Sequence, residues 1–258
     1  MDLGLSGKVA MVAAASKGIG LATAKQLAAE GCLVSICARN EEVLEAAAAE
    51  IGEETRSYVV DVSNPDDLHW WTSQTREDLG EPSILVTNTG GPKAAPLNEL
   101  EDADWQSGID STLMNVVRLV RLVQPSMVAA GWGRIVHVTS LVAREPNPLL
   151  PISSTLRSGL LALTKLQALE AAPHGVTVNA VLPGHTRTDR QTHIAKVRAE
   201  RQGIGLEESL AQGEREIPTG RFAEPEEVAA AIAFLCGYPA ASITGQSLLV
   251  DGGIVKGI

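Results

Sequence analysis

The stretch KVAMVAAASKGIG, residues 8–20, decides the fold. Its first half is a short apolar run, which predicts a buried strand. Gly18 and Gly20 then open a helical pattern that ends near Gly31. Glycines between a strand and a helix let the backbone approach a pyrophosphate, which the helix N-terminus attracts. We therefore expect a dinucleotide site here, the alternative being a plain tight turn.

Outward from this stretch, short apolar runs alternate with helical patterns along the chain. Strands are expected at 8–15, 32–38, 56–62, 83–90, 133–140, 175–184 and 246–253, and helices at 19–31, 41–51, 64–80, 102–130, 152–172 and 225–237. Strands that are apolar on both faces indicate a parallel sheet covered by helices on both sides. Right-handed crossovers then favour a doubly wound, Rossmann-type α/β fold. We expect one domain spanning 1–258, with seven strands in the order 3-2-1-4-5-6-7.

The composition of the chain limits the kinds of binding partner and the cellular compartment that we expect. The 258 residues carry a formal net charge of −10, which argues against general binding to nucleic acid or anionic membranes. No basic and apolar leader precedes the first strand, and no uncharged run is long enough to cross a bilayer. Three cysteines, an odd and sparse set, fit a reducing compartment. We expect a cytoplasmic protein with a small-molecule substrate and no metal site.

One segment, 189–217, breaks the alternation of strands and helices. It is long, charged and helical in composition, and it precedes a short helix and strand. Long excursions in compact domains are usually functional. The segment is interpreted as a lid over a substrate pocket, the alternative being a solvated surface excursion.

Over nearly its whole length the chain resembles the short-chain dehydrogenases/reductases. The family's glycine motif matches AAASKGIG (13–20), with Ala14 in place of the first glycine, and its adenine-contacting acid matches Asp61 in VVDVS. Its Asn-Ala-Gly turn matches TNTG (87–90). GRIVHVTS, VTVNAVLPG, RFAEPEEVAAAIAFLC and ITGQSLLVDGG resemble later family segments in order and spacing. The resemblance implies a nicotinamide cofactor and redox chemistry on a carbonyl or alcohol.

Cofactor preference is argued from charge near the adenosine ribose. An acid at the end of the second strand would favour NAD, but that stretch reads CARN, with Arg39 and no acid. Lys17 lies within the glycine turn, and two cations would attract a 2′-phosphate. NADP(H) is therefore favoured over NAD(H), unless both cations simply face solvent. The resemblance and this argument together place cofactor contacts at Ala14, Ser16, Lys17, Gly18, Ile19, Gly20, Arg39, Asp61, Val62, Asn88, Gly90, Arg157, Pro183, Gly184 and Thr188.

The catalytic positions depart from the family pattern. The family has a serine after its fifth strand, a tyrosine thirteen residues later, and a lysine four residues after that. The same spacing reaches Ser140, Ser153 and Arg157 here, which are the candidate catalytic residues. The family's asparagine on the preceding helix falls on Thr112, one turn before Asn115. A tyrosine-lysine proton relay is therefore expected to be absent.

Other residues would have to supply the proton. The chain has two tyrosines, Tyr58 and Tyr238, and neither is followed by a lysine four residues later. Arginine stays charged and is no ordinary base, although it can bind a carboxylate or polarise a carbonyl. Water, Glu145 and His185 are the candidate proton donors, with Glu145 alternatively a solvated loop residue and His185 a plain loop histidine.

These features favour an atypical NADP(H)-dependent oxidoreductase that acts on a carbonyl or alcohol substrate. The alternatives are a non-redox enzyme of lyase or hydratase type on the same fold, and a nucleotide-binding protein without catalysis. The helical stretches 102–130 and 152–172 are apolar on more than one face, which predicts association into a homodimer or homotetramer.

Overall fold

All seven expected strands form one parallel sheet in the computed structural model, which describes residues 2–257. The order is β3-β2-β1-β4-β5-β6-β7, as predicted. The strands are β1 (Val9–Val12), β2 (Leu33–Ala38), β3 (Arg56–Val59), β4 (Ile84–Thr87), β5 (Gly133–Val138), β6 (Val176–Pro183) and β7 (Ser247–Val250). The α-helices of the described residues are α1 (Gly18–Ala29), α2 (Glu41–Ile51), α3 (Pro65–Leu79), α4 (Asp102–Gly108), α5 (Asn115–Ala130), α6 (Pro151–Ala171), α7 (Asp189–Gln202), α8 (Leu206–Arg215) and α9 (Pro225–Cys236).

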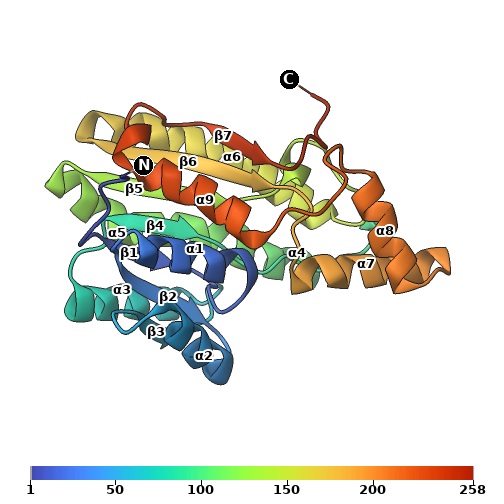
Figure 1. The fold of residues 1–258 in the computed structure, drawn as a ribbon, viewed down its shortest axis with the longest axis horizontal. Helices are drawn as coiled ribbons and strands as arrows, with labels where there is room; N and C mark the ends of the chain where they lie inside the picture. Colours follow the sequence, from blue (N-terminus) through green and yellow to red (C-terminus); the bar gives the residue numbers. More distant parts are fainter. Residues whose placement is uncertain (1, 258) are drawn as a thin grey trace.

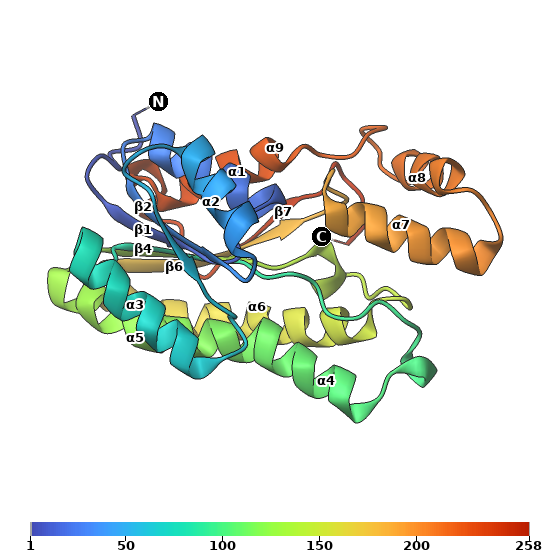
Figure 2. The ribbon, with the colours of Figure 1, turned by 90° about the horizontal axis from the view of Figure 1, so that it is seen from below.

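Helices cover the sheet on both faces and make two hydrophobic cores. Figure 2 shows α1, α2 and α9 on one side, and α3, α5 and α6 on the other. Residues at and just after β1 contribute alternately to the two cores, because successive side chains of a strand point to opposite faces of the sheet. Ala10 and Val12 belong to the α1–α9 side, whereas Met11 and Ala13 belong to the α3–α5–α6 side. The doubly wound α/β fold is thereby confirmed.

The stretch 102–130 is helical throughout but is not one regular helix. Six residues, Ile109–Met114, form a π-helical turn between α4 and α5. The apolar periodicity of the sequence did not reveal this turn. π-Helical turns are rare and frequently mark functional sites, and this one faces α6, the helix that carries Ser153 and Arg157.

The excursion at 189–217 consists of α7 and α8, joined at Gly203 in a left-handed conformation. Figure 1 shows the two helices, in orange, extending past the carboxyl ends of the strands. Among residues 2–257, no helix is both long and apolar enough to cross a membrane. The three cysteines are buried and unpaired.

Candidate active site

A cleft of about 1820 Å³ opens at the carboxyl ends of the strands. Its walls come from the segments that follow β1 to β6 and from the start of α7. Open parallel sheets bind ligands at this edge, where the order of strands reverses. Every residue named above as a cofactor or catalytic candidate lines the cleft except Gly20.

Gly20 lies behind the wall of the cleft and has a packing role of its own. A Cβ atom at this position would lie 2.5 Å from the carbonyl oxygen of Ala14 and 2.8 Å from Nδ2 of Asn88. The close packing of α1 against the end of β1 therefore requires glycine at this position. Nδ2 of Asn88 also donates a hydrogen bond to the Ala14 carbonyl at 3.1 Å, which ties β4 to the glycine turn.

The glycine turn itself has the shape that a pyrophosphate requires. Gly18 begins α1 with φ +54°, a conformation that side chains rarely adopt, and Ala14 has φ +48°. A Cβ atom on Gly18 would lie 3.1 Å from Cγ2 of Thr188, the residue that caps α7. The turn, the N-terminus of α1 and the start of α7 therefore form one close-packed cradle.

Two cations and one acid line the expected ribose end. Lys17 forms an exposed ion pair with Asp189 at 3.3 Å, and Arg39 is exposed. The Asp61 carboxylate accepts hydrogen bonds from the Ser63 backbone at 2.9 Å and hydroxyl at 2.7 Å. Burial alone would raise the pKa of Asp61, but these bonds and the charge of Arg39 lower it. Asp61 is therefore an anionic hydrogen-bond acceptor near the exposed Arg39.

The other end of the cleft holds the three candidate catalytic residues. Arg157, 6% exposed, donates from Nε to Ser153 Oγ at 3.1 Å and from Nη1 to the carbonyls of Val138 and Thr139 at 2.9 and 2.7 Å. Burial lowers the pKa of Arg157 to about 10, so the group remains charged at neutral pH. Ser140 accepts a hydrogen bond from the backbone of Val142 at 3.3 Å. The family spacing thus brings Ser140, Ser153 and Arg157 into one site.

The two protein candidates for proton transfer also line the cleft, and both have partners. Glu145 accepts a hydrogen bond from the backbone N–H of Lys256 at 2.7 Å. Nδ1 of His185 lies 3.2 Å from Oε1 of Gln191. Burial lowers the pKa of His185, although Gln191 and the negative charge of Glu216 oppose this shift. The burial of His185 therefore favours its neutral imidazole, and the ring stays a candidate for proton transfer at the wall of the cleft.

Thr112 and Asn115 are buried in the π-helical turn region and do not line the cleft. The hydroxyl of Thr112 and both amide atoms of Asn115 have no hydrogen-bond partner among the described residues. Tyr58 donates to Asp78 at 2.6 Å, and Tyr238 is 57% exposed beside Trp132. Within residues 2–257, the cleft has no tyrosine lining it.

Arg190 is a cleft residue that the sequence did not reveal. Its Nη2 donates to the carbonyl of Pro92 at 2.7 Å, and its guanidinium lies against Gly91, where a Cβ atom would be 2.5 Å from Nε. Burial lowers the pKa of Arg190, and its positive charge lowers that of Arg157. This arginine is 98 residues from Pro92 in the chain, so no local motif could announce the contact.

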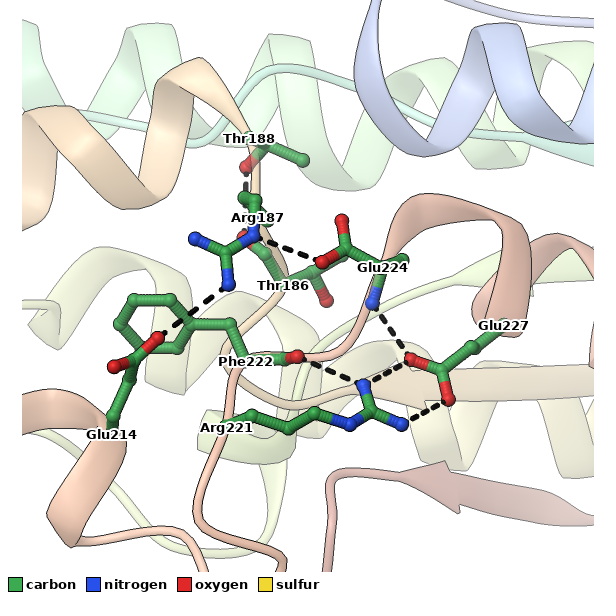
Figure 3. Close-up of polar contacts among 8 residues, drawn as sticks. All are labelled: Thr186, Arg187, Thr188, Glu214, Arg221, Phe222, Glu224 and Glu227. Carbon is green, nitrogen blue, oxygen red and sulfur yellow. Dashed lines mark hydrogen bonds and ion pairs between the residues drawn. The ribbon is translucent and has the colours of Figure 1, made fainter.

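Charged side chains brace the base of the α7–α8 excursion (Figure 3). Arg187 pairs with Glu224 at 2.9 Å, and its backbone N–H donates to the carbonyl of Ala223. Arg221 binds the Glu227 carboxylate with both terminal nitrogens at 2.7 Å. The segments that lead into and out of the excursion are therefore held together beside the cleft.

The chain is similar over nearly its whole length to known reductases, both in sequence and in structure. Residues 13–255 match a family model described as enoyl-(acyl carrier protein) reductase. The 3-oxoacyl-[acyl-carrier-protein] reductase of Synechocystis sp. is 36% identical over 256 residues, covering 97% of this chain and 98% of the relative. Actinorhodin polyketide ketoreductase, solved with NADPH, superposes with a TM-score of 0.94 at 32% identity, over 97% and 98% of the two chains. L-sorbose reductase from Gluconobacter frateurii, complexed with NADPH and L-sorbose, gives a TM-score of 0.94 at 33% identity over the whole of both chains.

Proposed function

The chain belongs to the short-chain dehydrogenase/reductase superfamily, and from that premise we propose that it is an NADP(H)-dependent oxidoreductase acting on a carbonyl or alcohol. The observation that carries this proposal is that one cleft has the glycine turn at one end and Ser140, Ser153 and Arg157 at the other. The reductases among the relatives favour redox chemistry over the lyase, hydratase and binding-only alternatives.

The residues present fit NADP(H). The backbone at Gly18 leaves room for a pyrophosphate on the N-terminus of α1. Lys17 and Arg39 supply exposed positive charge for a 2′-phosphate, and no acid lies between them at the end of β2. The structures of the two reductases solved with NADPH support the same cofactor. When bound, the cofactor supplies or accepts a hydride.

Catalysis, in this proposal, uses charge and orientation in place of a phenol. Arg157 holds a fixed positive charge in a buried site, where it polarises a carbonyl oxygen more strongly than it would in water. Ser153 Oγ accepts a hydrogen bond from Nε of Arg157, which leaves the hydroxyl hydrogen of Ser153 free to be donated into the cleft. Ser140 and Ser153 orient the carbonyl. Water then delivers the proton, since Glu145 and His185 already hold other partners.

The test combines cofactor binding with turnover. NADPH and NADH are titrated by fluorescence, and loss of reduced nicotinamide is then followed against a panel of ketones, aldehydes and oxo acids. We expect tighter NADPH binding and turnover of a subset of the panel. Failure to bind NADPH, or tight binding without turnover of any compound, would contradict the oxidoreductase assignment.

A further inference from the structure

Two arginines at the catalytic end of the cleft lack a carboxylate partner. Arg157 on α6 is 6% exposed, and Arg190 at the start of α7 is half-buried. Both line the cleft, and neither pairs with an aspartate or glutamate among residues 2–257. Their hydrogen bonds go to neutral acceptors: a serine hydroxyl and main-chain carbonyls.

Two buried or half-buried guanidinium groups without a counter-charge destabilise the folded protein unless a bound anion compensates their charge. Burying an ionised group without a counter-charge carries a large desolvation penalty. The two arginines also repel each other, since the charge of Arg190 lowers the pKa of Arg157. Nε and Nη1 of Arg157 are already bonded, so Nη2 remains for a ligand. An anion bound between the two groups would relieve both the desolvation and the repulsion.

The acids that line this part of the cleft are engaged elsewhere. Glu145 holds the backbone of Lys256, and Asp189 faces Lys17. Glu216 lies 3.8 Å from Arg198. The compensating anion is therefore not a side chain of the described chain.

The cofactor phosphates do not account for the two arginines either. A pyrophosphate belongs on the N-terminus of α1, and a 2′-phosphate belongs beside Lys17 and Arg39. Those groups follow β1 and β2, whereas Arg157 rests on the carbonyls that end β5, and Arg190 on the loop after β4. The remaining source of negative charge is the substrate.

We propose that the substrate is an oxo acid whose carboxylate is bound by Arg157 and Arg190. Guanidinium groups match a carboxylate in geometry as well as in charge. In a 2-oxo acid the carbonyl adjoins the carboxylate, so Arg157 can bind one and polarise the other. The carbonyl carbon gains a hydride from NADPH, which is oxidised, while the oxygen gains a proton from water and a 2-hydroxy acid forms. This assignment rests on the proposed function and specifies its substrate class.

Matched substrates test the assignment by turnover. Phenylpyruvate and its methyl ester differ in charge but share the carbonyl. We expect kcat/KM to be at least about tenfold higher for the acid in the parent protein. Arg190→Gln should lower kcat/KM for the acid by about tenfold or more relative to the ester, so that the preference for the acid is lost. Arg215→Gln, an exposed arginine of α8 outside the cleft, is the matched control and should change neither rate.

A binding measurement separates this inference from the redox assignment. Oxamate and its neutral amide are titrated by calorimetry into the protein saturated with NADP⁺, and into the protein alone. We expect oxamate to bind and its neutral amide not to bind. Arg190→Gln should weaken oxamate binding because it removes a charge, and Arg157→Lys should weaken it because one ammonium cannot replace the separate nitrogens that bond Ser153, the β5 carbonyls and the ligand. Arg-dependent oxamate binding without any turnover would uphold the anion site while the redox function fails. Equal rates for acid and ester with no oxamate binding would overturn the anion site and leave the reductase intact.

Discussion

Ala14 stores backbone strain at the point where the glycine turn begins. It is the one non-glycine residue with positive φ in the described chain, at +48°. We expect Ala14→Gly to raise the free energy of unfolding by about 1 kcal/mol, because a left-handed conformation costs an L-residue roughly that much. Urea denaturation measures the change. Ala13→Gly is the control and should destabilise, since Ala13 is buried with ordinary φ; a similar loss at Ala14 would contradict the strain.

Arg39 should determine the choice between the two nicotinamide cofactors. Its guanidinium is exposed at the rim of the cleft with no acid paired to it in the described chain. Arg39→Asp should lose about 1.5–3 kcal/mol of NADPH affinity, roughly ten- to a hundredfold, and should then favour NADH. Fluorescence titration with both cofactors checks this. Arg56→Asp on β3, outside the cleft, should leave the preference unchanged; equal affinities in the parent protein would contradict the assignment.

Arg157 should matter more to catalysis than Ser153. Water can replace a lost hydroxyl, but it cannot replace a fixed buried charge. We therefore expect a larger loss of kcat/KM in Arg157→Met than in Ser153→Ala, on the best substrate of the carbonyl panel. Because Arg157 also bonds the carbonyls that end β5, circular dichroism and NADPH binding serve as checks on folding. A loss concentrated in Ser153→Ala would instead make the serine the direct proton donor.

The spacing of residues in the sequence was enough to find cleft residues on neighbouring segments of the chain. It could not find a residue whose contact joins segments far apart in the sequence. Ser140 follows β5, and Ser153 and Arg157 lie one turn apart on α6, so the residue count of the resembled family reaches all three. Arg190, in the first turn of α7, contacts the carbonyl of Pro92, which is 98 residues away in the chain, and nothing local encodes that approach. The packing role of Gly20 was not visible in the sequence, because a glycine required for packing and one required for a ligand look alike there.

At the scale of elements, β4, β5 and α6 are joined by a buried polar chain. Nδ1 of His137 lies 2.8 Å from Oγ1 of Thr87, and Nε2 lies 2.8 Å from Oε1 of Gln167. Burial lowers the pKa of His137 to about 4 from a usual 6.5. Between these values the unfolded chain binds a proton that the folded chain does not. Stability from this group is therefore complete above pH 6.5 and declines as pH falls toward 4.

The expected loss across that window is roughly 3 kcal/mol, from the size of the pKa shift. Urea denaturation at several pH values measures it. His137→Asn is the matched variant, because an amide keeps hydrogen-bonding capacity but does not titrate in this range. The parent protein should lose more stability on acidification than the variant does. Parallel pH profiles for the two proteins would show that His137 is not the titrating group.

Helices and strands were predicted well where the periodicity of apolar residues is regular, and poorly where that periodicity changes. β3 ends at Val59 instead of 62, since the last residues of the expected run leave the sheet to line the cleft. The π-helical turn at Ile109–Met114 spans too few residues for a shift in periodicity to be visible. The excursion was recognised from its composition, but its division into α7 and α8 depends on one left-handed residue, Gly203.

For the whole molecule, two constraints that the sequence provides restrict the strand order. Apolar runs without polar alternation require a sheet buried on both faces, and right-handed crossovers then leave few ways to wind it. The order β3-β2-β1-β4-β5-β6-β7 satisfies both. This order also brings the ends of β1, β4 and β5 together. The glycine turn after β1 and the candidate catalytic residues after β5 therefore share one cleft.

The outer face of α6 should mediate self-association. Leu166 and Leu169 are 63% and 64% exposed on neighbouring turns of this helix, although most large apolar side chains are buried. Adjacent exposed leucines form a patch of the kind that protein interfaces cover. We expect the protein to sediment as a dimer or tetramer of the 27.1 kDa chain at micromolar concentration. The double variant Leu166→Glu/Leu169→Glu should sediment as a monomer, because an assembled interface would bury unpaired carboxylates.

Leu97 offers the matched control, since it is 64% exposed and lies away from α6 in a short 3-10 turn. Leu97→Glu should leave the sedimentation coefficient unchanged if the leucines of α6 are the specific contact. A monomeric parent protein would contradict self-association altogether. An assembled double variant would move the interface to another exposed apolar site, and Leu248 on the edge strand β7, 40% exposed, is the next position to substitute.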